Sequence, residues 1–127
     1  MILKAREVKE LNNTVNALLP LQLKMPFAYE IAVVAREIHD ADAKINVMKQ
    51  EIIERYAKRN SQGELIIDNE TGTIQVEENK ISQVNKELDN LYTRDIEINL
   101  NKIKIENLKD LELTVGQIAT LIPLIEK

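Results

Sequence analysis

A row of isoleucines at a spacing of seven residues constrains the fold of this chain more than any other feature. The row consists of Ile31, Ile38, Ile45 and Ile52. A second apolar row, three residues further on, consists of Val34, Ala41 and Met48. This is the a/d pattern of a coiled-coil helix, whose apolar stripe must be covered by a partner. Because no proline or glycine lies between Pro26 and Gly63, the pattern predicts one helix from Pro26 to Arg59, about 50 Å long.

A second apolar stripe later in the chain can cover the first. Its members are Ile81, Val84, Leu88, Leu91 and Ile98. Between the two stripes, the β-rich runs Leu65–Ile67 and Thr73–Val76 flank Asp68–Gly72, a sequence typical of a turn. We therefore expect a β-hairpin at the tip, which reverses the chain and makes the two helices antiparallel.

The two ends of the chain predict a small base of strands and short helices. After Asp95 the apolar period changes to two, which indicates half-buried strands at Ile96–Leu100 and Ile103–Ile105. Near the other end, Ile2–Ala5 is a candidate partner strand, followed by a helix at Glu7–Leu19.

A capping box marks the start of the last helix. Thr114 and Gln117 have the required types and spacing, and they predict a helix that continues to about Ile122, before Pro123. We therefore expect an α+β fold, mainly α, as a single domain of residues 1–127. It contains an N-terminal strand and helix (1–25), a helical hairpin (26–95) with its β-hairpin tip at 63–76, and C-terminal strands and helix (96–127).

The composition excludes several classes of protein. Of 127 residues, 44% are hydrophobic, which is ordinary for a globular domain. The absence of cysteine excludes disulfides, thiol nucleophiles and zinc fingers. The net charge of −4 argues against a nucleic-acid partner. No apolar run approaches the roughly 18 residues of a membrane span, so we expect a cytosolic protein without a membrane partner.

Residues that could carry chemistry are few. His39 is the only histidine, and with Asp42 it offers two ligands, too few for a closed metal site. Asp68–Gly72 resembles the start of a calcium loop but lacks the ligands that complete one. The serines, Ser61 and Ser82, have no activating residues beside them in the sequence. We expect no metal, no cofactor and no enzymatic activity.

The apolar stripe also predicts self-association. The second helix is shorter than the first, so part of the long stripe is expected to stay open within one chain. A second copy is the simplest cover, since exposing isoleucine costs roughly 1.5–3 kcal/mol per side chain. The expected interface of this homodimer consists of Ile31, Ile38, Ile45, Met48 and Ile52.

The candidate contacts with another molecule are the hairpin tip at Ile67–Thr73 or a basic cluster near the end of the long helix. Arg55, Lys58 and Arg59 form it, with Tyr56 among them and Tyr92 on the second helix. Arginine and tyrosine are frequent anchors of protein interfaces. The alternative interpretation is a cation arrangement that stabilises the helix C-terminus.

Several stretches resemble a family of short, largely uncharacterised proteins from phages and prophages of Gram-positive bacteria. The resemblance rests on Leu3–Val8, Ile52–Ala57, Asn85–Leu91, Ile96–Leu100 and Leu111–Ile125. It implies a phage-encoded protein of the host cytoplasm with a non-enzymatic, protein-binding role. That role is either virion assembly, of the tail for example, or inhibition of a host protein such as a defence factor. The alternative function is a sponge that holds a nucleotide-type signal through Arg55, Tyr56 and Arg59 at a dimer interface.

Overall fold

The computed structural model describes residues 1–109 and 111–126. In this part the fold is mainly helical, with small two-stranded sheets, in agreement with the expected fold class. Contacts divide the chain into two compact units, one of Met1–Ala43 with Asp95–Lys127 and one of Lys44–Arg94. Helix α2 (Phe27–Arg55) passes from the first unit into the second.

Helix α2 confirms the long helix that the isoleucine row predicts, with one correction at its end. It begins directly after Pro26 but stops at Arg55, four residues before the predicted end. The correction has a physical reason: the backbone of Lys58 forms hydrogen bonds with Ile66 and Gln75 and so leaves the helical path. Five stripe residues of α2 are buried: Ile31, Val34, Ile38, Ala41 and Ile45.

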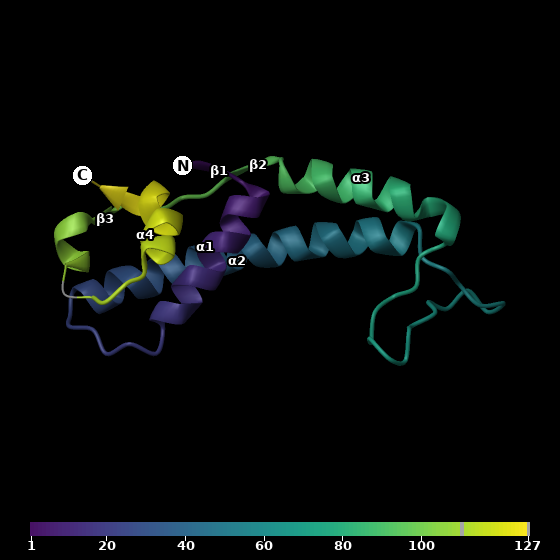
Figure 1. Cartoon of the computed structure of the whole chain (residues 1–127), viewed down its shortest axis with the longest axis horizontal. Coiled ribbons are helices and arrows are strands. Elements are labelled where there is room, and N and C mark those ends of the chain that lie inside the picture. Colours follow the sequence, from purple (N-terminus) through teal and green to yellow (C-terminus); the bar gives the residue numbers. More distant parts are fainter. Residues whose placement is uncertain (110, 127) are drawn as a thin grey trace. The chain divides into compact units, whose positions relative to one another are not determined.

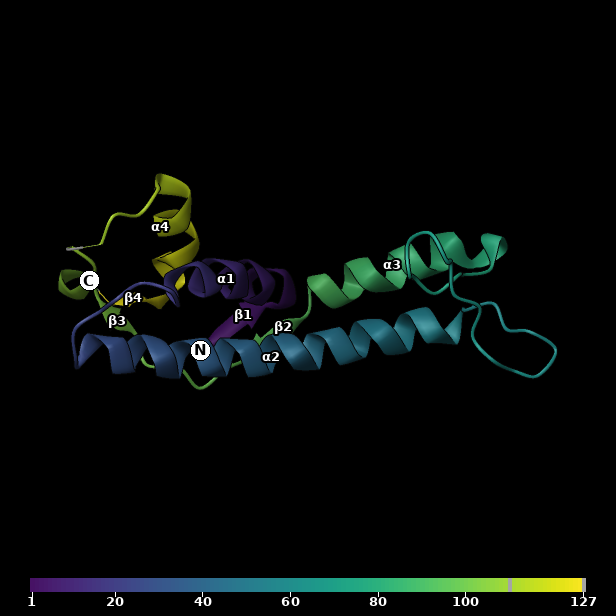
Figure 2. The ribbon, with the colours of Figure 1, turned by 90° about the horizontal axis from the view of Figure 1, so that it is seen from below.

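The first unit contains two small sheets (Figures 1 and 2). Strand β1 (Ile2–Lys4) pairs with β2 (Asp95–Glu97) in antiparallel register, which confirms the predicted partner strand. Strand β3 (Ile103–Lys104) pairs in parallel with β4 (Ile125–Glu126), a strand that the sequence pattern does not indicate. Ile105, predicted in a strand, instead begins the 3-10 helix η2 (Ile105–Leu108).

Short helices complete the first unit. Helix α1 (Ala5–Leu18) packs against α4 (Val115–Leu121), and the 3-10 helix η3 (Ile122–Leu124) carries Pro123 and ends α4. The predicted capping box is present, because Thr114 Oγ1 accepts from Gln117 N at 3.1 Å while Gln117 Oε1 accepts from Thr114 N at 2.9 Å.

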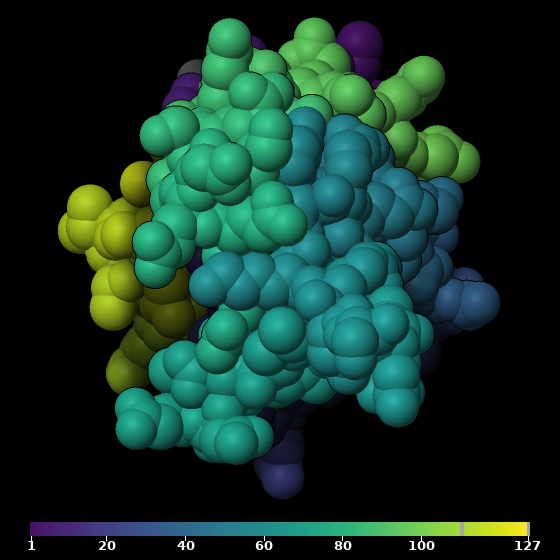
Figure 3. Space-filling model, turned by 90° about the vertical axis from the view of Figure 1, so that its right-hand side faces the viewer, coloured from purple at the N-terminus to yellow at the C-terminus, as the bar shows by residue number. Residues whose placement is uncertain are grey.

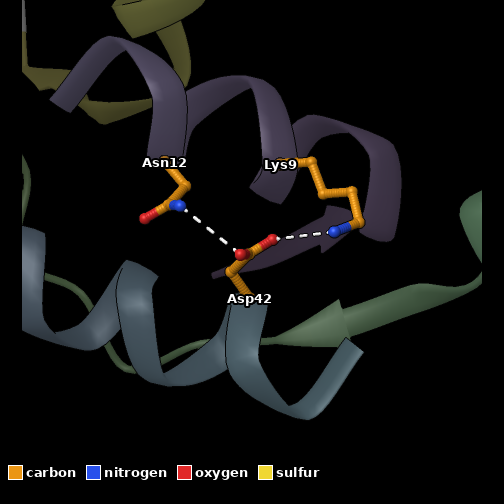
Figure 4. A network of polar contacts seen from close by, with 3 residues as sticks. All are labelled: Lys9, Asn12 and Asp42. Carbon is orange, nitrogen blue, oxygen red and sulfur yellow. Dashed lines mark hydrogen bonds and ion pairs between the residues drawn. The ribbon is translucent and has the colours of Figure 1, made fainter. Parts of the chain in front are cut away.

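Helix α1 contributes an apolar face and a polar link to the core of the first unit. Its buried side chains are Ala5, Val8, Leu11, Val15 and Leu18. On the side toward α2, Lys9 Nζ donates to Asp42 Oδ1 at 3.2 Å, and Asn12 Nδ2 donates to Asp42 Oδ2 at 3.4 Å (Figure 4). The carboxylate of Asp42 therefore joins the two helices with both of its oxygens.

In the second unit, helix α3 (Ile81–Tyr92) runs antiparallel to the last part of α2 (Figure 1). The side chain of Arg55 contacts Glu87, and that of Arg94 contacts Met48. Met48 lies seven residues before Arg55 on α2, and its partner Arg94 lies seven residues after Glu87, the partner of Arg55. This arrangement agrees with the expected antiparallel hairpin within the unit. The 3-10 helix η1 (Glu78–Lys80) leads into α3.

Ile98 corrects the predicted extent of the second stripe. The helix ends at Tyr92, where the Thr93 hydroxyl donates to the carbonyl oxygens of Asp89 and Asn90. Ile98 instead lies beyond β2 in the first unit, where its side chain is buried and its N–H donates to the carbonyl of Met1 at 2.8 Å.

The burial of α1 predicts unequal effects for two leucine truncations. Leu11→Ala, at a side chain 1% exposed, should lower the free energy of unfolding by about 2–5 kcal/mol because it leaves a cavity. Leu19→Ala, at a side chain 55% exposed, should change it by less than about 0.5 kcal/mol. Urea denaturation of both variants measures the difference. Equal effects would contradict the packing of α1.

Candidate functional site

The segment between the helices of the second unit, residues 56–77, forms the tip segment. The predicted hairpin is present, because Ile67 bridges Ile74 and Asp68 N donates to the carbonyl of Thr73 at 2.8 Å. The prediction missed a third strand-like stretch directly after α2. That stretch forms antiparallel bridges to both arms of the hairpin, from Ala57 to Val76 and from Arg59 to Leu65.

Three backbone hydrogen bonds close the tip segment into a ring. Lys58 N donates to Gln75 O at 2.8 Å, Gln75 N donates to Ile66 O at 2.9 Å, and Ile66 N donates to Lys58 O at 3.1 Å. Three stretches cannot all be antiparallel to one another along a common direction, so they must cross at angles. This explains why single bridges form instead of continuous ladders. The ring ties every stretch to both of the others.

The two loops of the tip segment are ordered by their own hydrogen bonds. In the first, Asn60 Oδ1 accepts from the backbone N–H groups of Gln62 and Glu64, both at 2.9 Å. In the second, Asp68 Oδ1 accepts from Glu70 N at 2.9 Å. Such side-chain caps hold turns without help from a core.

The tip segment is also accessible. Figure 3 faces this end of the second unit, and the teal side chains of the tip segment lie open to the viewer. Ile67, at the start of the second loop, is 54% exposed, whereas the neighbouring Leu65, Ile66 and Ile74 are half-buried. Single exposed apolar side chains are common on protein surfaces, so it is the ordered backbone around Ile67 that makes this loop a candidate contact.

A groove between α2 and α3 is the second candidate surface of this unit. Its volume is about 270 Å³. The groove is lined by Met48, Glu51, Ile52, Arg55, Glu87, Asn90, Leu91 and Arg94. At one end, Arg55 Nη1 donates to Glu87 Oε1 at 3.0 Å, while the other oxygen of Glu87 is buried without a partner. At the opposite end, Arg94 Nη1 donates to the sulfur of Met48 at 3.6 Å.

The predicted contact residues do not form one site. Arg55 lines the groove, but Tyr56, Arg59 and Tyr92 do not. Arg59 belongs to the tip segment, where its guanidinium donates to the carbonyl of Gly63 at 2.9 Å. Because α2 ends at Arg55, Lys58 and Arg59 lie beyond the helix, whereas Arg55 lies in its last turn, where the alternative interpretation expects a cation. Tyr56 and Tyr92 are half-buried.

Sequence reasoning missed Glu51, Glu87, Asn90 and Arg94 as lining residues of the groove. Each is a common type on an exposed helix face, so nothing in its identity marks it. These residues can be recognised as lining residues only when the register of the two segments is known. In that register Arg55 lies opposite Glu87, and Arg94 therefore lies opposite Met48.

The predicted dimer interface needs a correction. Ile31, Ile38 and Ile45 are buried within the single chain and are not available to a second copy in this state. The prediction assumed that part of the apolar stripe stays uncovered within one chain. This is wrong for Ile31 and Ile38, because both are buried within the first unit. Met48 and Ile52 are half-buried and line the groove. Self-association itself stays a prediction.

The described residues offer neither a metal-binding cluster nor a membrane-spanning helix. Within residues 1–109 and 111–126, no group of three or more acidic, histidine or cysteine side chains is placed to hold a metal ion. Over the same residues, no helix combines the length and the apolar content needed to cross a bilayer. His39 lies exposed on α2.

Comparison of the chain with protein-family models, with curated proteins and with solved structures found no match.

The backbone conformation of Gly72, in the second loop of the tip segment, predicts that this position requires glycine. Gly72 has φ +70°, in the left-handed region, and its N–H donates to the carbonyl of Asp68 at 2.7 Å. Gly72→Ala should lower the free energy of unfolding by about 1–2 kcal/mol through backbone strain, although a Cβ would meet no atom within 4 Å.

Gly116→Ala is the matched control, because this helical glycine has no positive φ and an added Cβ would make only an ordinary contact. This substitution should leave the free energy of unfolding unchanged or raise it slightly. Thermal and urea unfolding compare the two variants, and an unaffected Gly72→Ala protein would contradict the turn geometry.

Proposed function

We propose that this chain is a non-enzymatic protein-binding module that presents its tip segment to a partner protein. The observation that carries the proposal is the closed backbone ring of Lys58, Ile66 and Gln75, with ordered loops on either side of it. A partner that binds an ordered loop does not have to supply the free energy of fixing its backbone, about 1–2 kcal/mol per residue.

The second loop is the part of the tip segment best suited to the contact. Ile67 supplies exposed apolar area, and the backbone around Asp68 and Gly72 is fixed by hydrogen bonds at both ends of the turn. Carboxylates of Asp68 and Glu70 lie beside the apolar side chain in the sequence. This mixture of an apolar anchor with a polar surround is typical of transient protein interfaces.

The family resemblance suggests the biological setting of the proposal. In that setting the protein is phage-encoded, acts in the host cytoplasm as an oligomer, and binds either a virion protein during assembly or a host protein that it inhibits. These two versions differ in the partner and not in the surface that binds it, so one experiment on the tip segment serves both.

The test is affinity purification of the tagged chain from infected cells, with quantitative mass spectrometry of what is retained. Ile67→Asp should reduce recovery of the specific partner about tenfold or more, because it puts a charge at the centre of the apolar contact. A recovered virion protein supports the assembly version, and a recovered host protein supports the inhibitor version.

Val47→Asp is the matched control for this experiment. Val47 is 58% exposed on α2 of the same unit, so the substitution adds the same charge at a similar exposure away from the tip segment. It should leave recovery unchanged. A partner that is retained by the Ile67→Asp protein would contradict the proposed surface.

A nucleotide-binding function is the less supported alternative. It requires Arg55, Tyr56 and Arg59 around one ligand, and in the single chain only Arg55 lines the groove. Cyclic nucleotides and ADP-ribose derivatives should then raise the melting temperature, an effect that Arg55→Ala combined with Arg59→Ala removes. A panel of these compounds that produces no shift would end this alternative.

A further inference from the structure

A groove within the first unit, the aliphatic groove, is lined almost entirely by isoleucine and leucine. Its volume is about 300 Å³. The 3-10 helix η2, helix α4 and strand β4 all contribute to it, and they are yellow-green to yellow in Figure 1. The groove is open to solvent, because two of its side chains, Ile105 and Ile118, are 55% and 44% exposed. Its lining consists of Ile105, Leu108, Lys109, Leu111, Leu113, Ile118 and Ile125.

The lining of the aliphatic groove restricts the chemistry of what can fill it. Apart from Lys109, no lining side chain can donate or accept a hydrogen bond. A polar ligand atom placed against these side chains would therefore lose water without compensation. An extended peptide would bury its backbone amides in this way, and a helix about 10 Å across is too wide for a hollow of this volume. The body of a suitable ligand is therefore a hydrocarbon.

The volume of the aliphatic groove sets the size of that hydrocarbon. A cavity of about 150 Å³ accommodates benzene, with its six carbon atoms. A groove of about 300 Å³ therefore accommodates a single alkyl chain of roughly ten carbon atoms. A lipid with two longer chains would leave most of its hydrocarbon outside the groove.

The charged groups beside the aliphatic groove favour an anionic head group. Lys109 is the only charged residue of the lining, it is exposed, and within the described residues it forms no ion pair. Lys109 and Leu111 also line an adjoining hollow of about 600 Å³, which contains a second lysine, Lys24. One carboxylate, that of Glu106, lies on the same lining, so the cations outnumber it. A head group at this junction meets a net positive charge.

We propose that the aliphatic groove binds a free fatty carboxylate with a chain of about ten carbons. The alkyl chain lies along the isoleucine and leucine side chains, and the carboxylate accepts hydrogen bonds from the ammonium group of Lys109. This arrangement places apolar surface against apolar surface and pairs the one charged group of the lining. The site shares no residue with the tip segment, so the proposal goes beyond the protein-binding role.

Titration of the isotope-labelled full chain with decanoate, followed by two-dimensional NMR, tests the proposal. Decanoate should shift the amide signals of residues 105–125 and saturate at one molecule per chain. Its dissociation constant should be on the order of 1 mM, the value expected for a ligand of this size. Two comparison ligands, 1-decanol and decyltrimethylammonium, have the same chain without the negative charge and should bind about tenfold more weakly.

Two substitutions separate the two parts of the site. Lys109→Glu should weaken decanoate binding about tenfold, because it replaces an attraction by a repulsion, and should leave 1-decanol binding unchanged. Ile118→Asp should weaken binding of both ligands at least about tenfold, because it puts a charge against the alkyl chain. Ile118→Ser repeats the second test with a milder change, and far-ultraviolet circular dichroism checks that each variant is folded.

Each substitution has a matched control. Lys102→Glu makes the same charge change at an exposed lysine that lies outside both linings. Val115→Asp makes the same change as Ile118→Asp on the same helix α4, at a side chain that is 85% exposed and outside the lining. Both controls should bind decanoate as the wild-type protein does.

Four results would overturn the proposal. They are the absence of saturable decanoate binding, equal binding of decanoate and 1-decanol, decanoate binding that survives Ile118→Asp, and binding to phosphatidylglycerol vesicles without binding of free decanoate. The last result would assign the groove to a membrane surface. None of them involves Ile67, so the protein-binding role of the tip segment stands or falls by its own experiment.

Discussion

Burial of the isoleucine stripe on α2 is the constraint on which both units depend. A helix of this length cannot leave such a stripe in water, because each exposed isoleucine costs roughly 1.5–3 kcal/mol. The chain covers the stripe in two ways. Ile31 and Ile38 are buried within the unit that contains both chain ends, whereas α3 packs along the last part of the helix in the other unit. One periodic element therefore organises two separate groups of segments.

The point at which α2 ends decides what the second unit can present. The helical pattern has no glycine or proline to stop it before Gly63, yet the helix stops at Arg55 because the following backbone finds partners in both arms of the hairpin. The residues after Arg55 then complete the ring that orders the tip segment. The same termination leaves Arg55 beside Glu87, at one end of the groove.

Prediction from the sequence succeeds where the signal is local. The stripe of α2, the capping box of Thr114 and the turn at Asp68–Gly72 all depend on residues a few positions apart, and all are present. It fails where partners are distant in the chain. The third stretch of the tip segment, the pairing of β3 with β4 and the burial of Ile31 and Ile38 within one chain are of this kind.

The sequence by itself determined which face of each helix is apolar, where the hairpin turns and which chemistry is excluded, since periodicity, glycine positions and composition are properties of the chain. Only the tertiary structure decided which apolar face meets which and in what register. Sliding one helix by a turn preserves its pattern but changes every opposing pair, so the register follows from packing over the whole unit. The pairing of Arg55 with Glu87, and the exposed Arg94 seven residues on, exist only in the register that packing selects.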